Sequence, residues 1–343
     1  MHRFKFIRFS RMHISRIVLL FVVGSFVLPI TYGQGCSDAG FCTMGAMKPD
    51  QAFSKNIDFK LRAIEISQYR GKTTLSPEIY VSTIDATFGI NYKTAFQVKV
   101  PYQYVTGNLG QTQGLSDISL SITRQLLSNN KFDLNATLGA KIPTNKSDLA
   151  KENNEFGVDG ADYPMYYQVS LGSYDIIAGV SMISRKWLVA IGYQDALTTN
   201  ENNFKWGQWD DYPNLEKRVV DSVHSYIAKH PRATNLKRGT DVMLRVERNW
   251  RFTNYNFTLG ALPIYRIVQD QRQTLNNGEP SGQYEKIDKT TGLALSVLAS
   301  AGYHFNVNSS VKLILGWKIT KREINPDGLT RHAVQSIAYV FRF

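Results

Sequence analysis

Charged side chains recur at alternate positions within segments that are otherwise apolar. Six acids and six bases follow this pattern together with one amide: Asp85, Lys99, Asp117, Asp133, Asn135, Lys141, Asp175, Asp241, Arg245, Glu247, Lys312, Lys318 and Arg342. Such side chains on one face of a sheet could form ion pairs that hold it rigid, or could line a narrow passage and select solutes. Because the two signs are balanced, the pattern argues against a strongly ion-selective channel.

Residue types that could support catalysis are present but poorly spaced for it. The chain has no HExxH, GxSxG, P-loop or dinucleotide-binding motif. His332 and Ser336 could in principle form the His–Ser pair of a lipid-modifying hydrolase on the outer face of a barrel. Four positions along one strand separate two side chains by about 13 Å, too far for a hydrogen bond unless a bulge intervenes. We therefore predict no enzyme activity, no cofactor and no bound metal.

The elements that would position the alternating charges are twelve stretches of alternating apolar and polar residues. Most are about 10–14 residues long, roughly twice the usual length of a strand in a globular protein. Ten residues in a strand tilted by about 40° rise about 25 Å, the height of the apolar belt of an outer-membrane barrel. The stretches cover residues 58–69, 78–90, 95–105, 116–127, 132–143, 174–184, 187–197, 239–248, 252–266, 291–304, 310–320 and 333–343.

One hairpin shows why alternation alone does not decide the fold. In GLSDISLSITRQLLSNNKFDLNATLGAKIPT, residues 114–144, one phase holds Ile118, Leu120 and Leu134. A soluble β-sandwich would turn this phase toward its core, and a membrane barrel would turn it toward lipid. Both folds are compatible with this hairpin.

The lengths of the links between the stretches favour the barrel. Every second link has five residues or fewer, namely 91–94, 128–131, 185–186, 249–251 and 305–309. The other links have eight residues or more, namely 70–77, 106–115, 144–173, 198–238, 267–290 and 321–332. Outer-membrane barrels have this asymmetry, whereas a sandwich has no reason to sort its links. The sequence therefore predicts an all-β fold: a transmembrane antiparallel up-and-down β-barrel of twelve strands, with short periplasmic turns and long extracellular loops.

Some residues depart from a regular alternation. The apolar phase of the first stretch changes between Leu61 and Ile64, so we expect a bulge there. Pro101 cannot donate a ladder hydrogen bond, so we expect a bulge or a strand end near it. Arg124 falls on the lipid-facing phase close to a turn, from which its charge can snorkel toward water. Within the link 198–238, apolar residues at helical spacing predict a short amphipathic helix.

Aromatic residues of the lipid-facing phase gather near the ends of the stretches. Girdles of aromatic residues at both membrane surfaces are typical of outer-membrane barrels. The residues concerned are Tyr80, Phe88, Tyr92, Phe96, Tyr102, Tyr104, Trp187, Tyr193, Tyr303 and Phe305.

The N-terminus predicts export. Residues 1–33 combine a basic region with the apolar run IVLLFVVGSFVLPI, whose 14 residues are too few for a comfortable membrane span. Thr31 and Gly33 supply the small residues that signal cleavage before Gln34 requires. An uncleaved anchor and a lipoprotein cut before Cys36 stay open as alternatives.

Two parts are expected after the signal peptide. Residues 34–57 form an N-terminal periplasmic or plug segment, and residues 58–343 form the barrel. Export favours a disulfide between Cys36 and Cys42, which would staple only the N-terminal segment. The last strand ends on Phe343, and its aromatic spacing resembles the recognition signal that the bacterial barrel-assembly machinery reads.

Composition limits the classes of partner. The formal net charge is +12, but five bases and no acid lie in the first 33 residues, which leaves +7 for the rest. The rest shows no compact basic stripe, so we predict no nucleic-acid binding. The expected partners are outer-membrane lipid, a small-molecule solute and the assembly machinery. The expected location is the outer membrane of a Gram-negative bacterium.

Three short segments resemble a known family. They are GLSDISLSITRQLL, LGAKIPT and LGSYDIIAGVSMIS, and the best matches within them are Pro143–Thr144 and Tyr174–Asp175. They resemble the outer-membrane barrel family associated with the meta-pathway of phenol degradation, often described as transporters. The similarity spans Leu75 to Phe343, and the long link 198–238 departs from the family pattern.

The resemblance implies passive uptake of small compounds, hydrophobic ones included, and it carries over no catalytic residues. It agrees with the hypothesis of a polar passage. The competing hypothesis is a structural or surface-interaction barrel whose lumen is plugged and whose long loops recognise a partner.

Overall fold

The computed structural model describes residue 44 and residues 60–73, 77–107, 109–152, 160–204, 233–277, 279–329 and 331–343. These residues all belong to one compact unit, Gly33–Phe343. No helix within the described ranges is long and apolar enough to cross a membrane. The predicted signal peptide, Cys36, Cys42 and the predicted amphipathic helix of the link 198–238 lie outside the described residues.

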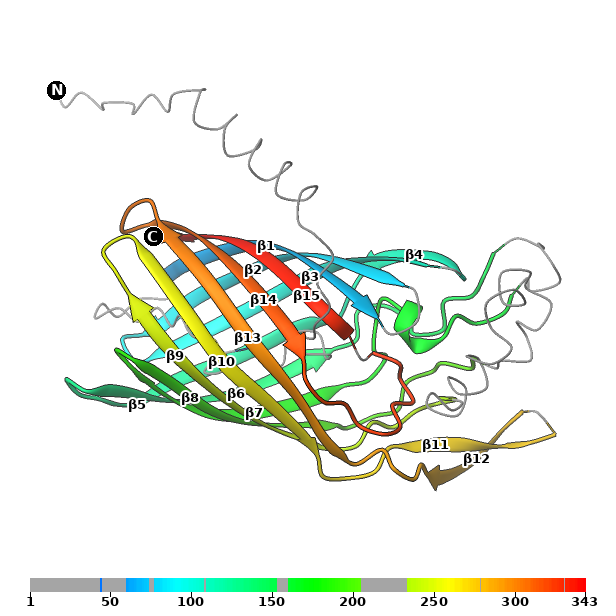
Figure 1. Cartoon of the computed structure of the whole chain (residues 1–343). Coiled ribbons are helices and arrows are strands. Elements are labelled where there is room, and N and C mark those ends of the chain that lie inside the picture. Colours follow the sequence, from blue (N-terminus) through cyan, green and yellow to red (C-terminus); the bar gives the residue numbers. More distant parts are fainter. Residues whose placement is uncertain are drawn as a thin grey trace. The chain divides into compact units, whose positions relative to one another are not determined.

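The strands close into one antiparallel barrel (Figure 1). Neighbouring strands follow the order β2-β1-β15-β14-β13-β10-β9-β8-β7-β6-β5-β3-β4, and the pairing of β2 with β3 closes the sheet. Because β4 and β5 are two parts of one barrel strand, the barrel has the twelve strands that the sequence predicts. The bounds are β1 Lys60–Thr73, β2 Glu78–Asn91, β3 Thr94–Gly107, β4 Gly110–Leu115, β5 Ile118–Ser128, β6 Phe132–Ile142, β7 Asp175–Ser184, β8 Trp187–Ala196, β9 Asp241–Arg251, β10 Tyr255–Arg266, β13 Gly292–His304, β14 Ser309–Lys318 and β15 Arg331–Arg342.

The links are sorted by length, with corrections at the long-loop end. The first long link shrinks to residues 74–77, because β1 and β2 stay paired as far as Lys72 and Glu78. Most of the second becomes β4, which pairs with the end of β3. The fifth contains a separate hairpin, β11 Gln271–Asn276 and β12 Glu279–Lys286, whose strands pair only with each other. Polar residues allow these extensions beyond the membrane, where alternation of apolar residues is not required.

The predicted bulge in the first strand is confirmed. The register between β1 and β2 shifts between Leu61 and Ala63, so that Leu61 and Ile64 both fall on the outer phase. The extra residue, Arg62, turns its guanidinium inward, and Nη2 donates to the carbonyl of Asn91 at 2.9 Å. A Cβ on Gly89 would stand 2.0 Å from Arg62 Nε, so glycine at this position makes room for the bulged side chain.

β3 runs through Pro101 without the bulge or strand end expected in that stretch, and the break lies opposite it in the neighbouring strand, between β4 and β5. β3 pairs with β5 over Thr94–Lys99 and with β4 over Tyr102–Gly107. At the join, the N–H of Ser116 donates to the carbonyl of Pro101 at 2.8 Å. Proline has no N–H to return, so the ladder on this side is interrupted at its position.

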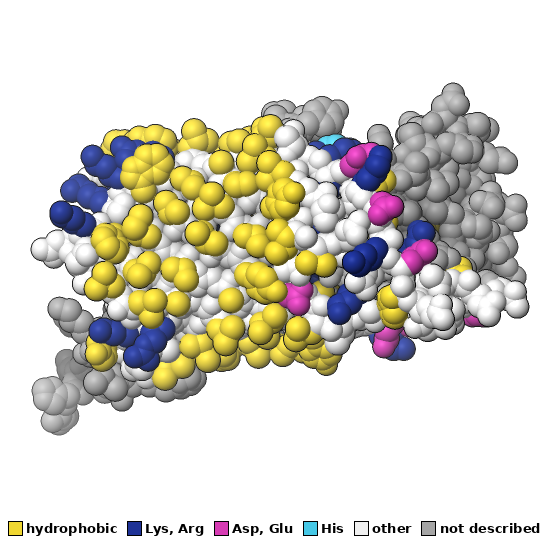
Figure 2. Space-filling view, turned by 90° about the horizontal axis from the view of Figure 1, so that it is seen from below, with side chains coloured by type: hydrophobic (Ala, Val, Ile, Leu, Met, Phe, Trp, Pro, Cys, Tyr) yellow, Lys and Arg dark blue, Asp and Glu magenta, His cyan; other side chains and the backbone are white. Residues whose placement is uncertain are grey.

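The outer face of the barrel is apolar. Ile84, Leu138 and Ile191 are each more than half exposed, although a soluble protein would bury them. Figure 2 shows a broad hydrophobic band with lysine and arginine side chains at one edge and mixed charges beyond the other. Arg124 is exposed on the outer face near the short turns, where its charge can reach water. The exterior is that of a membrane-spanning barrel.

Aromatic residues border this band at both ends. Tyr80 and Tyr104 have ring centroids 6.2 Å apart near the long-loop end, and Phe88 and Phe96 have centroids 6.5 Å apart near the short-turn end. The guanidinium of Arg248 lies 5.1 Å from the ring centroid of Trp187, also near a short turn. Rings with an adjacent cation suit the boundary between lipid and water.

Candidate functional site

The predicted set of thirteen polar residues lies away from the lipid-facing side chains. Twelve of them occupy strand positions that alternate with the exposed apolar residues. We call these strand positions the interior phase. The thirteenth, Asp117, lies at the join of β4 and β5. The register places Asp85 opposite Lys99 and Lys141 opposite Asp175. Lys99, Asp133, Lys312, Lys318 and Arg342 are half-buried, and the other eight residues are buried.

Two of the predicted acids are bound by residues of the long loops. Asp117 accepts hydrogen bonds from Ser170 Oγ at 2.5 Å and from the N–H of Leu171 at 3.0 Å. Asp175 forms a buried ion pair with Arg238, a residue that precedes β9. Asp117 lies at the break between β4 and β5, and Asp175 is the first residue of β7, so these contacts fasten two loops to the barrel wall.

A third predicted acid belongs to a buried ionic network. Asp241 accepts from Arg266 Nε at 2.9 Å and from Nη2 at 2.7 Å. The remaining guanidinium nitrogen, Nη1, donates to both carboxylate oxygens of Asp270, at 2.7 and 2.8 Å. Arg322, in the last long link, also approaches Asp241 at 3.4 Å. Two-sided pairing compensates the cost of burying these charges and ties three segments together.

The long loops share an apolar core with the barrel wall. Tyr163 and Tyr167 stack with centroids 5.5 Å apart, and the hydroxyl of Tyr167 accepts from the N–H of Leu109 at 3.1 Å. The cluster joins Ile79 and Val105 of β2 and β3 to loop residues, namely Leu109, Ala161, Tyr163, Met165, Tyr166, Tyr167, Leu171, Phe204, Ala233, Leu236, Ile287 and Leu329. We call it the loop core. It includes η3 (Met165–Tyr167), a single 3₁₀ turn.

The interior phase of β2 to β6 carries a polar network. Gln97 Nε2 donates to Asp85 at 2.7 Å, and Ser121 Oγ donates to Gln97 Oε1 at 3.2 Å. The hydroxyls of Thr123 and Thr137 lie 2.6 Å apart. Neighbouring strands therefore satisfy one another's polar groups along this part of the wall.

Among the residues that the structure describes, Asn135 and Ser181, on the interior phase closer to the short turns, have no hydrogen-bond partner. Asn135 is fully buried, yet neither its amide nitrogen nor its oxygen forms a hydrogen bond. Ser181, directly opposite Asn135 in the register, is also buried and its hydroxyl is unpartnered. One further carboxylate oxygen, Glu247 Oε2, is buried without a partner, while Oε1 pairs with Arg245 at 2.5 Å.

An apolar patch on the interior phase was not predicted. Ile177, Ala190, Met243, Leu262 and Leu298 form one buried cluster, with one residue from each of β7, β8, β9, β10 and β13. We call it the apolar seat. In β7 both phases are apolar, because Ile176 faces out and Ile177 faces in. Strict alternation assigns one phase to lipid and the other to polar side chains, so it overlooks such a site.

The loop core was also missed, although a signal was present. The sequence Met165–Leu171 concentrates apolar residues within a predicted loop. Solvent-exposed loops have little reason to carry such a run, because apolar side chains are stable only where they are buried. The role of Asp117, Asp175 and Asp241 as loop ligands had no comparable signal, since it depends on contacts between segments distant in sequence.

The pair considered for hydrolysis does not lie on the lipid face. Ser336 shares the interior phase with the buried residues Val334 and Ala338. His332 lies at a register shift between β1 and β15. A lipid-modifying hydrolase on the outer surface would need both groups outside, so this arrangement does not support that reaction. Within the described ranges, no cluster of His, Cys, Asp and Glu could hold a metal ion.

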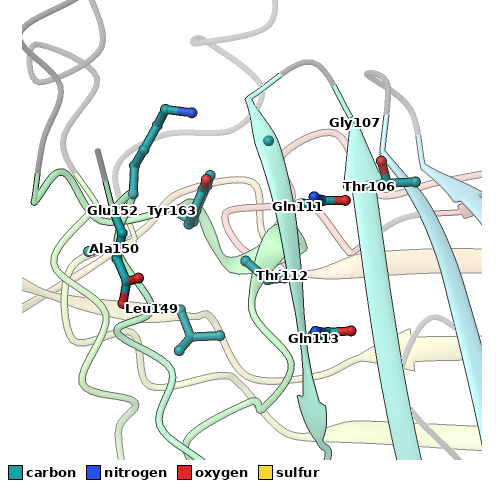
Figure 3. A pocket seen from close by; sticks show the side chains of 11 residues that line it. Thr106, Gly107, Gln111, Thr112, Gln113, Leu149, Ala150, Glu152 and Tyr163 are labelled. Carbon is teal, nitrogen blue, oxygen red and sulfur yellow. The ribbon is translucent and has the colours of Figure 1, made fainter. Parts of the chain in front are cut away.

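A groove of about 610 Å³ lies between the β3–β4 hairpin and residues 149–152 (Figure 3). Gln111, Thr112 and Gln113 of β4 and Tyr163 and Glu152 of the loop line it. The Thr112 side chain points toward Tyr163, whereas those of Gln111 and Gln113 point to the other side of the strand (Figure 3). Amide and hydroxyl groups could hold a hydrogen-bonding ligand, but the groove belongs to the long-loop end and not to the predicted set of interior residues.

An exposed ion pair joins two of the long links. Lys289 Nζ lies 2.6 Å from Glu323 Oε1. The hydrogen bond and the negative charge of Glu323 raise the pKa of Lys289 above its ordinary value. From neutral pH upward, the contact therefore contributes its full stability up to the ordinary lysine pKa and loses it as pH rises through the raised value.

The comparison with solved structures supports the fold. The sequence matches no protein-family model and no curated protein. The COG4313 outer membrane channel from Pseudomonas putida F1 has a similar structure, with a TM-score of 0.55 and 11% identity, covering 86% of this chain and 99% of that chain.

Two further solved barrels are more distant. The NanC porin matches with a TM-score of 0.44 and 5% identity, covering 83% of this chain and 100% of that chain. The CymD monoaromatic hydrocarbon channel matches with a TM-score of 0.38 and 10% identity, covering 87% and 91%. These two similarities are too weak to carry an argument about this chain.

Closed antiparallel strands, a lipid-facing apolar band and aromatic girdles require a membrane that accepts β-barrels. The channel from Pseudomonas putida F1 has a similar fold. The chain is a twelve-stranded β-barrel of the outer membrane.

Proposed function

We propose that this barrel lets small, partly apolar solutes cross the outer membrane of a Gram-negative bacterium without an energy source. The observation that carries the proposal is the interior phase, which holds an apolar seat beside a charged and polar wall. A passage for water and ions alone would need no apolar seat. Twelve strands give a lumen between those of filled eight-stranded barrels and open porins of 16–18 strands.

The residues of the predicted polar set would have two different roles. Asp85, Asn135, Arg245 and Glu247 would line the passage. Asp117, Asp175 and Asp241 would hold the loops that must part or leave a path for a solute. The resemblance to the family of the phenol-degradation pathway favours small hydrophobic compounds as cargo, and we propose that class without naming a compound.

A second candidate is a structural or surface-interaction barrel with a plugged lumen. The loop core favours it, because apolar contacts and buried ion pairs hold several long links over the interior phase. In that case the long loops would recognise a partner, and no solute would pass.

Liposome swelling and planar-bilayer recording separate the two candidates. The transport proposal predicts conductance and entry of small solutes into liposomes that contain the purified barrel. A folded barrel with neither flux nor conductance would refute transport and favour the second candidate. Folding is checked independently, because a folded outer-membrane barrel changes its mobility on gels when it is boiled.

Three predictions about the chain ends accompany this proposal. The signal peptide 1–33 would direct export, and Cys36 and Cys42 would form a disulfide in the oxidising periplasm. Phe343 would be read by the assembly machinery, supported by its exposure and its ring contact with Phe341, 5.0 Å between centroids. Loss of outer-membrane insertion on deletion of Phe343, with Arg342 retained, would support this role.

A further inference from the structure

The apolar seat holds one residue from far earlier in the chain. Met44 is only 1% exposed and belongs to the same cluster as Ile177, Ala190 and Met243. Its terminal methyl carbon, Cε, lies 2.8 Å from the point where a Cβ on Gly139 would stand. Gly139 is an interior position of β6, so the missing side chain leaves the space that the Met44 methyl fills.

Met44 is well suited to a site that must also be emptied. Its contacts in the seat are apolar, and an unbranched thioether can leave and re-enter a pocket without breaking hydrogen bonds. Once it left, an apolar hollow lined by five strands would remain.

Unpartnered polar groups border the seat on the side of the short turns. Ser181 is directly opposite Ala190 in the register, and Asn135 is directly opposite Ser181. Buried amide and hydroxyl groups without partners are costly, so such groups are normally satisfied by water or a ligand. Together they offer an amide donor, an amide acceptor and a hydroxyl next to an apolar surface.

The charge beside the seat is balanced. Arg245 faces Ala190 from the strand on its other side, and its guanidinium pairs with Glu247 at 2.5 Å. A charged ligand would have to compete with this buried pair, whereas a neutral hydrogen-bonding group would not. The surroundings therefore favour a neutral ligand over an ionic one.

We propose that the apolar seat is a solute-binding station, which Met44 occupies until a solute displaces it. The solute would be a small neutral molecule with an apolar body, which fills the seat, and a hydroxyl or carbonyl group, which bonds to Asn135 and Ser181. This inference rests on the proposed transport function, and it names the class of solute and the place where that solute competes with the protein's own side chain.

Methionine oxidation tests the displacement directly. The purified full-length barrel is treated with hydrogen peroxide, and sulfoxide formation at Met44 is followed by mass spectrometry. Cyclohexanol should speed oxidation of Met44 several-fold, and glycerol, which has hydroxyls without an apolar body, should not. Met182, which is exposed on the outer face, serves as the internal reference. A Met44 rate that cyclohexanol leaves unchanged relative to Met182 would overturn the proposal.

A second pair of probes tests the hydrogen bonds to Asn135 and Ser181. Cyclohexane has the same ring without the hydroxyl, so it should displace Met44 less effectively than cyclohexanol. Replacing both polar residues, Asn135→Ala with Ser181→Ala, should remove the difference between the two probes. Equal effects of the two probes on the unaltered barrel would eliminate the hydrogen-bonding part of the proposal.

Conductance provides a second readout. Met44→Asn should vacate the seat and raise single-channel conductance several-fold, while Met44→Leu, which keeps an apolar side chain, should stay close to the unaltered barrel. Equal conductance of the two variants would contradict a plugging role. If the barrel passes no solute but Met44 still responds to cyclohexanol, transport fails and the binding station stands. If solutes pass but cyclohexanol leaves the oxidation rate of Met44 unchanged, the binding station is refuted and the transport function stands.

Discussion

The interior phase has two regions that look alike in sequence and differ in structure. Near the long loops, Asp117, Asp175 and Asp241 are each held by residues from other segments. Nearer the short turns, Asn135 and Ser181 are equally buried and have no side-chain hydrogen-bond partner within the described part of the chain. The first region is a set of anchors for loops, and the second is the part of the wall that can bind something else.

The largest effect is expected from the anchors. Arg266→Ala would leave Asp241 and Asp270 buried without their shared partner, and removing one member of a buried ion pair costs about 3–5 kcal/mol. The free energy of unfolding, measured with urea on the barrel in lipid vesicles, should fall by that order.

A matched control for Arg266 lies on the hairpin β11–β12. Arg272 pairs with Glu285 at 2.6 Å, but both side chains remain partly exposed. Exposed pairs contribute at most about 1 kcal/mol, so Arg272→Ala should change the free energy of unfolding little. Similar losses in the two variants would show that the network around Arg266 is not an anchor.

A pair of asparagines tests the contrast between partnered and unpartnered groups. Asn202 and Asn135 are both fully buried, but Asn202 Nδ2 donates to the carbonyls of Ser147 and Tyr163 at 2.8 and 2.9 Å. Asn202→Ala would remove the Nδ2 donor from the Ser147 carbonyl and the Oδ1 acceptor from the N–H of Phe204, while the Tyr163 carbonyl would keep its bond from Gln168 Nε2. Leaving these buried groups without that partner should cost about 1–3 kcal/mol. Asn135→Ala breaks no hydrogen bond and should cost less in the same unfolding experiment. The reverse order would mean that Asn135 has partners in the folded protein.

The smallest effect concerns pH. The pKa of Lys289 is raised by Glu323, so from neutral pH upward this contact contributes fully up to the ordinary lysine pKa and is lost as pH rises through the raised value. Protease protection of the links that hold both residues should therefore stay constant from neutral to mildly alkaline pH and fall only at strongly alkaline pH. Because the pair is fully exposed, added salt should weaken it, and Glu323→Gln should remove the pH response. A fall in protection already at neutral pH would contradict this assignment.

Alternation and link length predicted most of the barrel, because both follow from how a strand meets lipid. Leu61 and Ile64 revealed a bulge, because they violate the alternation within their own strand. Pro101 pointed to an irregularity, but the break lies in the neighbouring strand and not in its own. β4 and the hairpin β11–β12 were missed because strands beyond the membrane need no apolar phase.

Contacts between distant segments could not be predicted in the same way. Ile177 and Leu298 belong to stretches whose two phases are both apolar, so the alternation gives no reason to place an apolar seat inside. Asp133 follows a short link and Asp175 a long one, but nothing in the pattern identifies Arg238 as the partner of Asp175. The sequence predicted which residues face inward, but not which of them form ion pairs or hydrogen bonds with other segments.

The most direct test of this division compares the planar-bilayer conductance of Asp175→Asn and Asp133→Asn. Both variants remove one negative charge from the interior phase. Asp175 anchors the loop that contains Arg238, whereas the hydrogen bonds of Asp133 stay within its own hairpin, to Gln125 and Ser128. The account predicts that Asp175→Asn raises conductance several-fold by releasing the loop and that Asp133→Asn changes it little. Equal changes in the two variants would contradict the distinction between anchors and lining.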